Sequence, residues 1–168
     1  MNRNGGLLCS LTMLMLCACN SNTAPGNDRE AQLDSAPMPA SVVPASQALS
    51  GIATEAVQAE TMTATEIASL GGAEGRCLIR LTRVGLPSFV LDERHGTGAI
   101  KLNNKLIPLQ AEPGGHYYSD GDLRVVIRPV DQQLAKEVFR EVDMIVMLPG
   151  AKDELGYRGY EDCSQAPE

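Results

Sequence analysis

The sequence predicts a mainly β fold, a small antiparallel sandwich or barrel with one or two short helices, placed after a disordered N-terminal tether. Two observations predict the fold class. From residue 76 onward, short runs of β-branched and alternating apolar residues follow one another closely, and Gly, Pro, Asn and Asp turn residues separate them. Before that region, proline, alanine and serine dominate residues 20–46, which hold too few large apolar residues to form a core.

One helix signal precedes the strands. Thr63 and Glu66 have the spacing of a capping box, and Ile67 and Leu70 follow with helical spacing before Gly71-Gly72. These features predict a short helix over residues 64–70.

The strand region begins at Cys77. Asn103-Asn104 tolerates positive φ and predicts a two-residue hairpin turn, and residues 119–122 predict a second turn. Residues 132–142 fit either a helix or a strand. The predicted strands are 77–84, 87–91, 99–102, 105–109, 116–118, 123–130 and 144–148, with a last strand near 157–160.

The first eighteen residues have the features of an export signal. Arg3 supplies a positive charge, the apolar run Leu7–Leu16 is too short to span a bilayer, and the small residue Ala18 precedes Cys19. We therefore expect this segment to direct export.

Leu16-Cys17-Ala18-Cys19 resembles the lipobox of bacterial lipoproteins, with Cys17 in place of the usual Ala, Ser or Thr. The resemblance implies that the Cys19 thiol receives a diacylglyceryl group, that a peptidase cuts before Cys19, and that a fatty acid such as palmitate is added to the new amino group. Asn20, where an Asp would signal inner-membrane retention, resembles cargo sent to the outer membrane. The implied organisation is a signal peptide over 1–18, a lipidated N-terminus and disordered tether over 19–61, and a β-rich periplasmic domain over 62–168.

Cysteine usage agrees with export. Two of the five cysteines lie in the signal segment and Cys19 is the lipidation site, so Cys77 and Cys163 remain, near the two ends of the strand region. In an oxidising compartment such a pair predicts a disulfide, and two separate buried thiols are the alternative.

Charge and motifs exclude several classes of activity. Without Arg3 the mature chain carries 13 basic and 21 acidic residues, a net charge of about −8, which disfavours nucleic-acid binding. Neither a nucleophile elbow, nor a zinc-binding HExxH helix, nor a phosphate-binding loop occurs. His95 lies beside two acidic residues in what reads as a polar hairpin loop, and neither His95 nor His116 has metal-ligand spacing. The sequence predicts a protein that is not an enzyme and that has no cofactor or metal; an envelope enzyme using His95 or His116 is the alternative.

Residues 149–160 are the most distinctive stretch of the strand region. Tyr157, Arg158 and Tyr160 would suit an exposed binding loop, because Tyr and Arg supply much of the contact energy of interfaces. The favoured alternative is a tight turn that leads into the last strand, with the two tyrosines packed over the sheet edge.

The lipobox, the tether and the terminal cysteines also resemble the membrane-bound C-type lysozyme inhibitors, which are small lipid-anchored β-barrels with a disulfide. Gly114-Gly115-His116-Tyr117 echoes the Ser-Gly-x-x-Tyr loop of that family, but its serine and lysine have no counterpart here. We expect a lipoprotein, anchored through Cys19 at the periplasmic face of the outer membrane. Its β domain would be structural or would bind an envelope protein partner, and lysozyme inhibition is an alternative.

Overall fold

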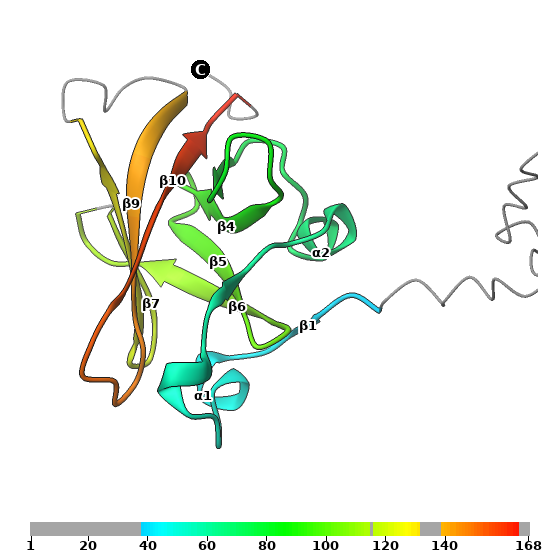
Figure 1. Cartoon of the computed structure of the whole chain (residues 1–168). Coiled ribbons are helices and arrows are strands. Elements are labelled where there is room, and N and C mark those ends of the chain that lie inside the picture. The colour runs from blue at the N-terminus through cyan, green and yellow to red at the C-terminus, as the bar shows by residue number, and fades with distance from the viewer. Residues whose placement is uncertain (1–37, 115, 132–138, 165–168) are drawn as a thin grey trace, which may run out of the picture. The chain divides into compact units, whose positions relative to one another are not determined.

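Eight consecutive antiparallel strands form a closed up-and-down barrel, which a computed structural model describes over residues 38–114, 116–131 and 139–164. Each strand pairs with the next in the sequence, and the last strand pairs back onto the first (Figure 1). The strands are β3 (Cys77–Arg80), β4 (Pro87–Asp92), β5 (Thr97–Leu102), β6 (Lys105–Ala111), β7 (Tyr117–Asp120), β8 (Leu123–Pro129), β9 (Phe139–Met147) and β10 (Leu155–Asp162). The mainly β prediction is confirmed, and the fold is the barrel rather than the sandwich.

Alternation along the strands fills the barrel with apolar side chains. At Gly98 of β5 an added Cβ would lie 2.7 Å from the Phe89 ring, so the interior has no room even for a methyl group there. The largest fully buried interior side chains include Ile79, Phe89, Leu91, Ile100, Leu102, Ile107, Leu109, Tyr118, Leu123 and Met144.

The N-terminal segment of the domain closes one end of the barrel. Strand β1 (Ser41–Val42) pairs with the start of β6, and β2 (Ala59–Glu60) pairs with the end of β5. Between them lie α1 (Ala45–Ala48) and the short 3-10 helix η2 (Thr54–Ala56). The small side chains of this segment are part of the barrel core, and Figure 1 shows α1 at the end of the barrel opposite the end of β10.

This packing corrects the predicted domain boundary. The folded unit begins at Met38, not at residue 62, because Ala45, Ala48 and Val57 are buried against the barrel strands. The many small side chains of this segment predicted a tether, but the same small side chains fit the narrow space at the end of the barrel. The signal peptide, Cys19 and the remainder of the predicted tether lie outside the described residues.

Helix α2 (Ala64–Ser69) begins with the predicted capping box. The Thr63 hydroxyl accepts the backbone N–H of Glu66 at 3.3 Å, and the Glu66 carboxylate accepts the backbone N–H of Thr63 at 2.7 Å. On its buried side, α2 packs with Leu78 and Val90 on the outer wall of the barrel. Within the described part of the chain, no helix is long and apolar enough to cross a membrane.

The turns follow the sequence predictions in part. Asn103 and Asn104 have φ values of 49° and 54°, as a two-residue hairpin turn of type I′ requires. The predicted strand 77–84 ends at Arg80, and β7 continues to Asp120 before its turn. Residues 132–138 lie outside the described residues, and the rest of the ambiguous stretch belongs to β9.

Candidate functional site

The end of the barrel opposite α1 carries a cluster of polar side chains that we call the barrel mouth. It is formed by Glu93, His116, Tyr118, Arg140 and Glu161 around a cavity of about 10 Å³. Tyr118, Arg140 and Glu161 come from β7, β9 and β10, while Glu93 and His116 lie in the turns before β5 and β7. A cavity of this size holds about one water molecule, so it is too small for an organic substrate.

Glu161 and Arg140 form a buried ion pair at the centre of the mouth. The Arg140 Nε donates to the Glu161 carboxylate at 2.6 Å, and the two side chains are 15% and 2% exposed. Burial raises the pKa of Glu161, and the charge and hydrogen bond of Arg140 only partly oppose this effect. The two charged groups bond each other within the fold, so neither is readily available to bind a ligand.

Tyr118 extends into the mouth from the barrel interior. Its ring meets Phe89 edge to face, with 5.4 Å between the ring centroids. Burial and the nearby carboxylates of Glu93, Glu161 and Asp92 raise the pKa of Tyr118 to about 12. The phenol therefore stays protonated at neutral pH and is a poor general base.

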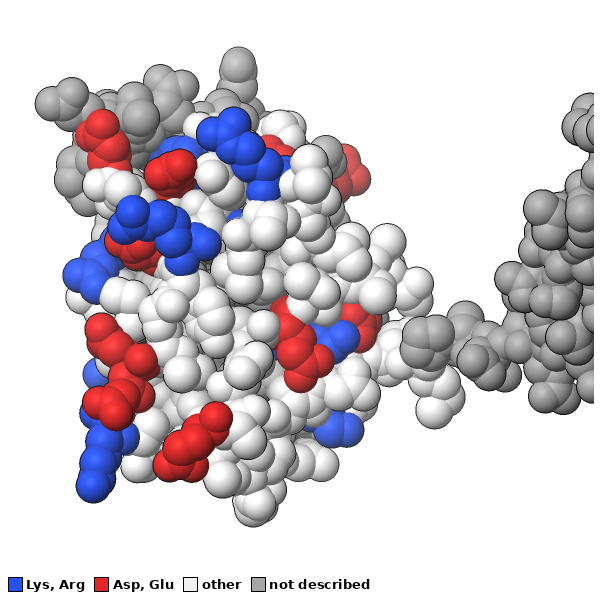
Figure 2. All heavy atoms as spheres, viewed as in Figure 1, with Lys and Arg blue, Asp and Glu red and all other residues white. Residues whose placement is uncertain are grey.

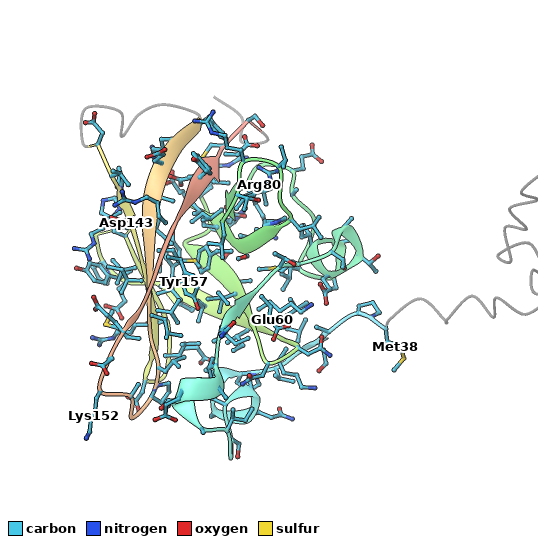
Figure 3. All side chains as sticks on the ribbon, viewed as in Figure 1. Met38, Glu60, Arg80, Asp143, Lys152 and Tyr157 are labelled. Carbon is cyan, nitrogen blue, oxygen red and sulfur yellow. A yellow bond between two sulfur atoms is a disulfide. The ribbon has the colours of Figure 1, made fainter. Side chains whose placement is uncertain are left out.

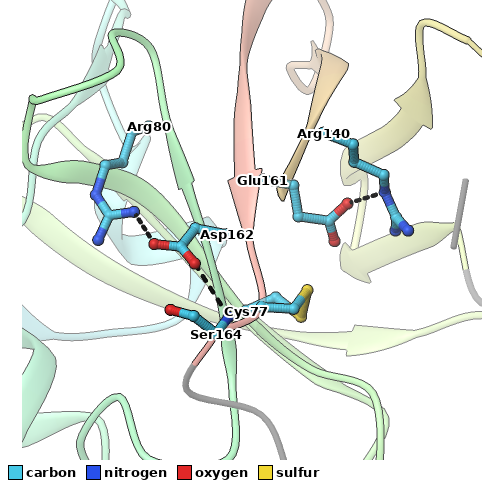
Figure 4. The surroundings of a disulfide bond; sticks show 7 residues. Cys77, Arg80, Arg140, Glu161, Asp162 and Ser164 are labelled. Carbon is cyan, nitrogen blue, oxygen red and sulfur yellow. Dashed lines mark hydrogen bonds and ion pairs between the residues drawn. A yellow bond between two sulfur atoms is a disulfide. The ribbon is translucent and has the colours of Figure 1, made fainter. Parts of the chain in front are cut away.

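The seam between β3 and β10 closes the barrel beside the mouth (Figure 4). Only three residue pairs join these strands, and the Cys77–Cys163 disulfide and the Arg80–Asp162 ion pair of 2.7 Å reinforce them. The predicted disulfide is thus present, across 86 residues of sequence. At Gly159 an added Cβ would lie 2.5 Å from the Arg80 carbonyl oxygen, so the close approach of the strands requires glycine.

The seam also gathers the potential metal ligands Cys77, Cys163 and Glu161, whose ligand atoms lie within 4.8 Å of one another. Both sulfur atoms are already joined in the disulfide, and a disulfide sulfur is not the thiolate that binds a metal. In this oxidised form the group offers a metal a single carboxylate.

His95 lies in the hairpin loop between β4 and β5, as the sequence predicted. The Asp92 carboxylate accepts the His95 backbone N–H at 3.1 Å, contacts the ring Nδ1 at 2.8 Å, and receives the Arg76 Nε at 3.3 Å. Burial alone would raise the pKa of Asp92, but these bonds outweigh it and lower the pKa below its ordinary value. The Asp92 carboxylate therefore fixes the hairpin, and His95 itself is largely exposed.

The turn at residues 149–150 leads into β10, as the favoured alternative predicted, and Tyr157, Arg158 and Tyr160 lie on that strand and not in a binding loop. Tyr157 points inward, and its hydroxyl accepts the backbone N–H of Ala59 at 3.0 Å, which joins β10 to the strand that ends at Glu60 (Figure 3). Arg158 and Tyr160 face outward on the alternate positions, and Arg158 pairs with Asp143 at 3.0 Å. The three residues do not form one site.

Sequence reasoning missed the barrel mouth. Glu161 and Arg140 stand 21 positions apart, and neither belongs to a recognisable motif. The available signal was the two-residue alternation of a strand. Glu161 lies four positions after Tyr157 on β10, so both side chains are on the inward face of the strand.

These features define a closed eight-stranded β-barrel with a filled interior, a polar mouth that contains the Arg140–Glu161 ion pair, and a disulfide across its seam. The chain belongs to a family described as a domain of unknown function, DUF6692, whose model matches residues 15–166. Comparison with curated proteins and with solved structures gives no match for the chain.

Proposed function

We propose that this protein is a bacterial lipoprotein, lipidated at Cys19, which presents a non-catalytic binding domain at the periplasmic face of the outer membrane. The 18 residues from Asn20 to Pro37 would connect the lipid to the folded unit that begins at Met38. A disulfide across the barrel seam is consistent with an oxidising compartment.

The filled barrel interior is the main observation behind the proposed binding role, because it leaves only the outer surface of the barrel for a partner. Lipocalin-like barrels hold a ligand inside, but here the interior is occupied by packed apolar side chains. Two pairs of charged groups in and beside the mouth, Arg140 with Glu161 and His95 with Asp92, are bonded within the fold. The binding surface would therefore be the outer wall, where Figure 2 shows acidic and basic side chains interspersed around a broad uncharged area.

The anchor is tested by Cys19→Ala with Cys17→Ala as the matched control. The first change removes the lipidated thiol, whereas the second removes a thiol two positions away. We expect the control to fractionate with membranes and the Cys19→Ala protein to be lost from them. The anchor is falsified if both variants stay with the membranes to the same extent.

A lysozyme inhibitor is the second candidate. The eight-stranded barrel and the disulfide are consistent with that resemblance, and His116 and Tyr117 are exposed where the β6–β7 loop meets the mouth. Purified protein should then slow the lysis of bacterial cell walls by a C-type lysozyme, and Tyr117→Ala should weaken the inhibition. Unchanged lysis at excess protein would exclude this candidate.

A further inference from the structure

The loop between β3 and β4 exposes two large apolar side chains. Val84 is 97% exposed and Leu86 is 50% exposed, although the loop has only six residues, 81–86. Exposed Val and Leu side chains close together are the kind of surface that marks a contact with another molecule or with a membrane.

An aromatic stack extends this exposed surface onto the outer wall of the barrel. The guanidinium carbon of Arg83 lies 5.0 Å from the centroid of the Tyr160 ring, and Tyr160 stacks on Phe139 at 5.6 Å with an interplanar angle of 6°. Phe139 is itself 45% exposed. We call these five residues, Arg83, Val84, Leu86, Phe139 and Tyr160, the β3–β4 patch.

The chemistry of the β3–β4 patch fits the interface of a lipid bilayer. Apolar side chains enter the boundary between head groups and acyl chains, aromatic rings lie at the head-group level, and an Arg contacts lipid phosphate while its stem stays in apolar surroundings. A bilayer also requires no shape complementarity from a small loop.

The N-terminal segment of the described domain contacts the start of β4, next to the β3–β4 loop. Met62 donates its backbone N–H to the carbonyl of Pro87, the residue after Leu86, and Ala40 packs in one cluster with Met62 and Val90. Eighteen residues separate Met38 from Cys19. A fully extended chain of that length would reach roughly 60 Å, at about 3.3 Å per residue, which is more than the width of a domain of this size.

We infer that the β3–β4 patch docks on the same bilayer that holds the lipid anchor, with Val84 and Leu86 inserted at the head-group boundary and Arg83 on lipid phosphate. The inference rests on the proposed lipidation at Cys19. Two or three apolar side chains bind a membrane weakly, but the anchor keeps the domain at a high local concentration beside it, so the contact forms.

The absence of tryptophan from the chain gives a direct test. Val84→Trp places a single fluorescent reporter in the patch, and Ile52→Trp is the matched control, because Ile52 is 38% exposed in the loop between α1 and η2. Both lipidated proteins are inserted into vesicles of phosphatidylethanolamine and phosphatidylglycerol with brominated acyl chains. We expect Val84→Trp to emit at shorter wavelength and to be quenched at least about two-fold more than Ile52→Trp, since bromine quenches only an inserted ring.

Vesicle flotation separates failure of docking from failure of the anchor. If both proteins float and both tryptophans are quenched equally or not at all, the docking inference is overturned while the anchor stands. If neither protein floats, both proposals fall. A blue shift of Val84→Trp that needs native envelopes and is absent on pure lipid would instead assign the patch to a protein partner and also overturn the inference. Adding Leu86→Asp to Val84→Trp should abolish the quenching, with an unchanged circular dichroism spectrum as the check on folding.

Discussion

Glu66 and Glu161 are both buried carboxylates paired with a cation, yet the fold shifts their pKa values in opposite directions. Burial acts against the charge of Glu66, but hydrogen bonds and the Lys101 ammonium outweigh it and lower the pKa from 4.5 to about 2. Burial raises the pKa of Glu161, and Arg140 does not reverse the shift.

Burial sets the direction of the shift at Glu161, and a larger number of donors reverses the effect of burial at Glu66. Glu66 accepts the backbone N–H groups of Ala40 and Thr63 and the Lys101 ammonium, at 2.7 to 3.0 Å. Among the described residues, Arg140 is the side chain that donates to Glu161. The nearby negative charge of Glu93 further raises the pKa of Glu161. Several converging donors lower the pKa of a buried carboxylate, whereas the single cation at Glu161 does not offset the effect of burial.

The two regions are therefore held together differently. Glu66 joins the N-terminal segment, helix α2 and strand β5 through charge-assisted hydrogen bonds. The region of Glu161 depends on the disulfide and on the close approach of β3 and β10 at Gly159. Mutations on each side should separate these two mechanisms.

The largest effect should come from the disulfide. Replacing Cys77 and Cys163 by Ser removes a constraint across 86 residues and should lower the free energy of unfolding by about 4 kcal/mol, because the unfolded chain gains loop entropy. Urea denaturation measures the loss, and reduced wild-type protein should behave like the variant. An unfolding midpoint that does not respond to reduction would contradict this role.

Glu66→Gln should have the next largest effect, about 2–3 kcal/mol at neutral pH, because it leaves the Lys101 ammonium buried without its counter-charge. The folded-state pKa is below the unfolded value, so the contribution of Glu66 is fully present above about pH 4.5 and is lost as the pH falls toward 2. Denaturation curves of the two proteins should converge over that range. The exposed Glu74→Gln is the control, and a loss equal to that of Glu66→Gln would argue against the network.

Gly159→Ala should destabilise the seam by about 1–2 kcal/mol, since the new methyl group would overlap the Arg80 carbonyl. Gly156→Ala on the same strand is the matched control, because its Cβ would meet no atom within 4 Å. Thermal unfolding compares the two variants. Equal melting temperatures would show that the space beside Gly159 accepts a methyl group and would contradict this role of the glycine.

The smallest effect is expected for Glu161→Gln, less than about 1 kcal/mol at neutral pH, because the Gln carbonyl can still accept the Arg140 hydrogen bond and burial already raises the cost of the Glu161 charge. A raised folded-state pKa gives stability that is present below the unfolded value of 4.5 and is lost as the pH rises through the raised value. The wild type should therefore lose stability relative to Glu161→Gln as the pH rises from about 4.5 through the raised pKa. Carboxyl NMR titration supplies the direct comparison, and a Glu161 pKa below that of Glu66 would reverse it.

Local chemistry was readable from the sequence, and long-range pairing was not. The spacing of Thr63 and Glu66 predicts the start of their helix, and the tolerance of Asn103-Asn104 for positive φ predicts their turn. The disulfide followed from counting the cysteines left after the predicted signal peptide and lipidation site. Each of these depends on neighbours in the sequence or on one compartment-wide rule.

The missed features depend on contacts that form only in the closed barrel. Ala45 and Ala48 look like tether residues until the end of the barrel gives their methyl groups a place to pack. Tyr157 and Tyr160 look alike in the sequence, but alternation on β10 sends one inward to Ala59 and the other outward to Arg83. The ion pair of Arg140 with Glu161 likewise needs β9 and β10 in register.

The central proposal for this protein is a folded barrel held at a membrane by one lipidated cysteine. Intact mass spectrometry of the mature protein, purified from membranes of its natural host, tests this claim most directly. We predict a chain that begins at Cys19, carries the mass of a diacylglyceryl group with or without an additional acyl chain, and retains the Cys77–Cys163 disulfide. A mature chain that begins elsewhere, or that begins at Cys19 without lipid, would contradict the claim.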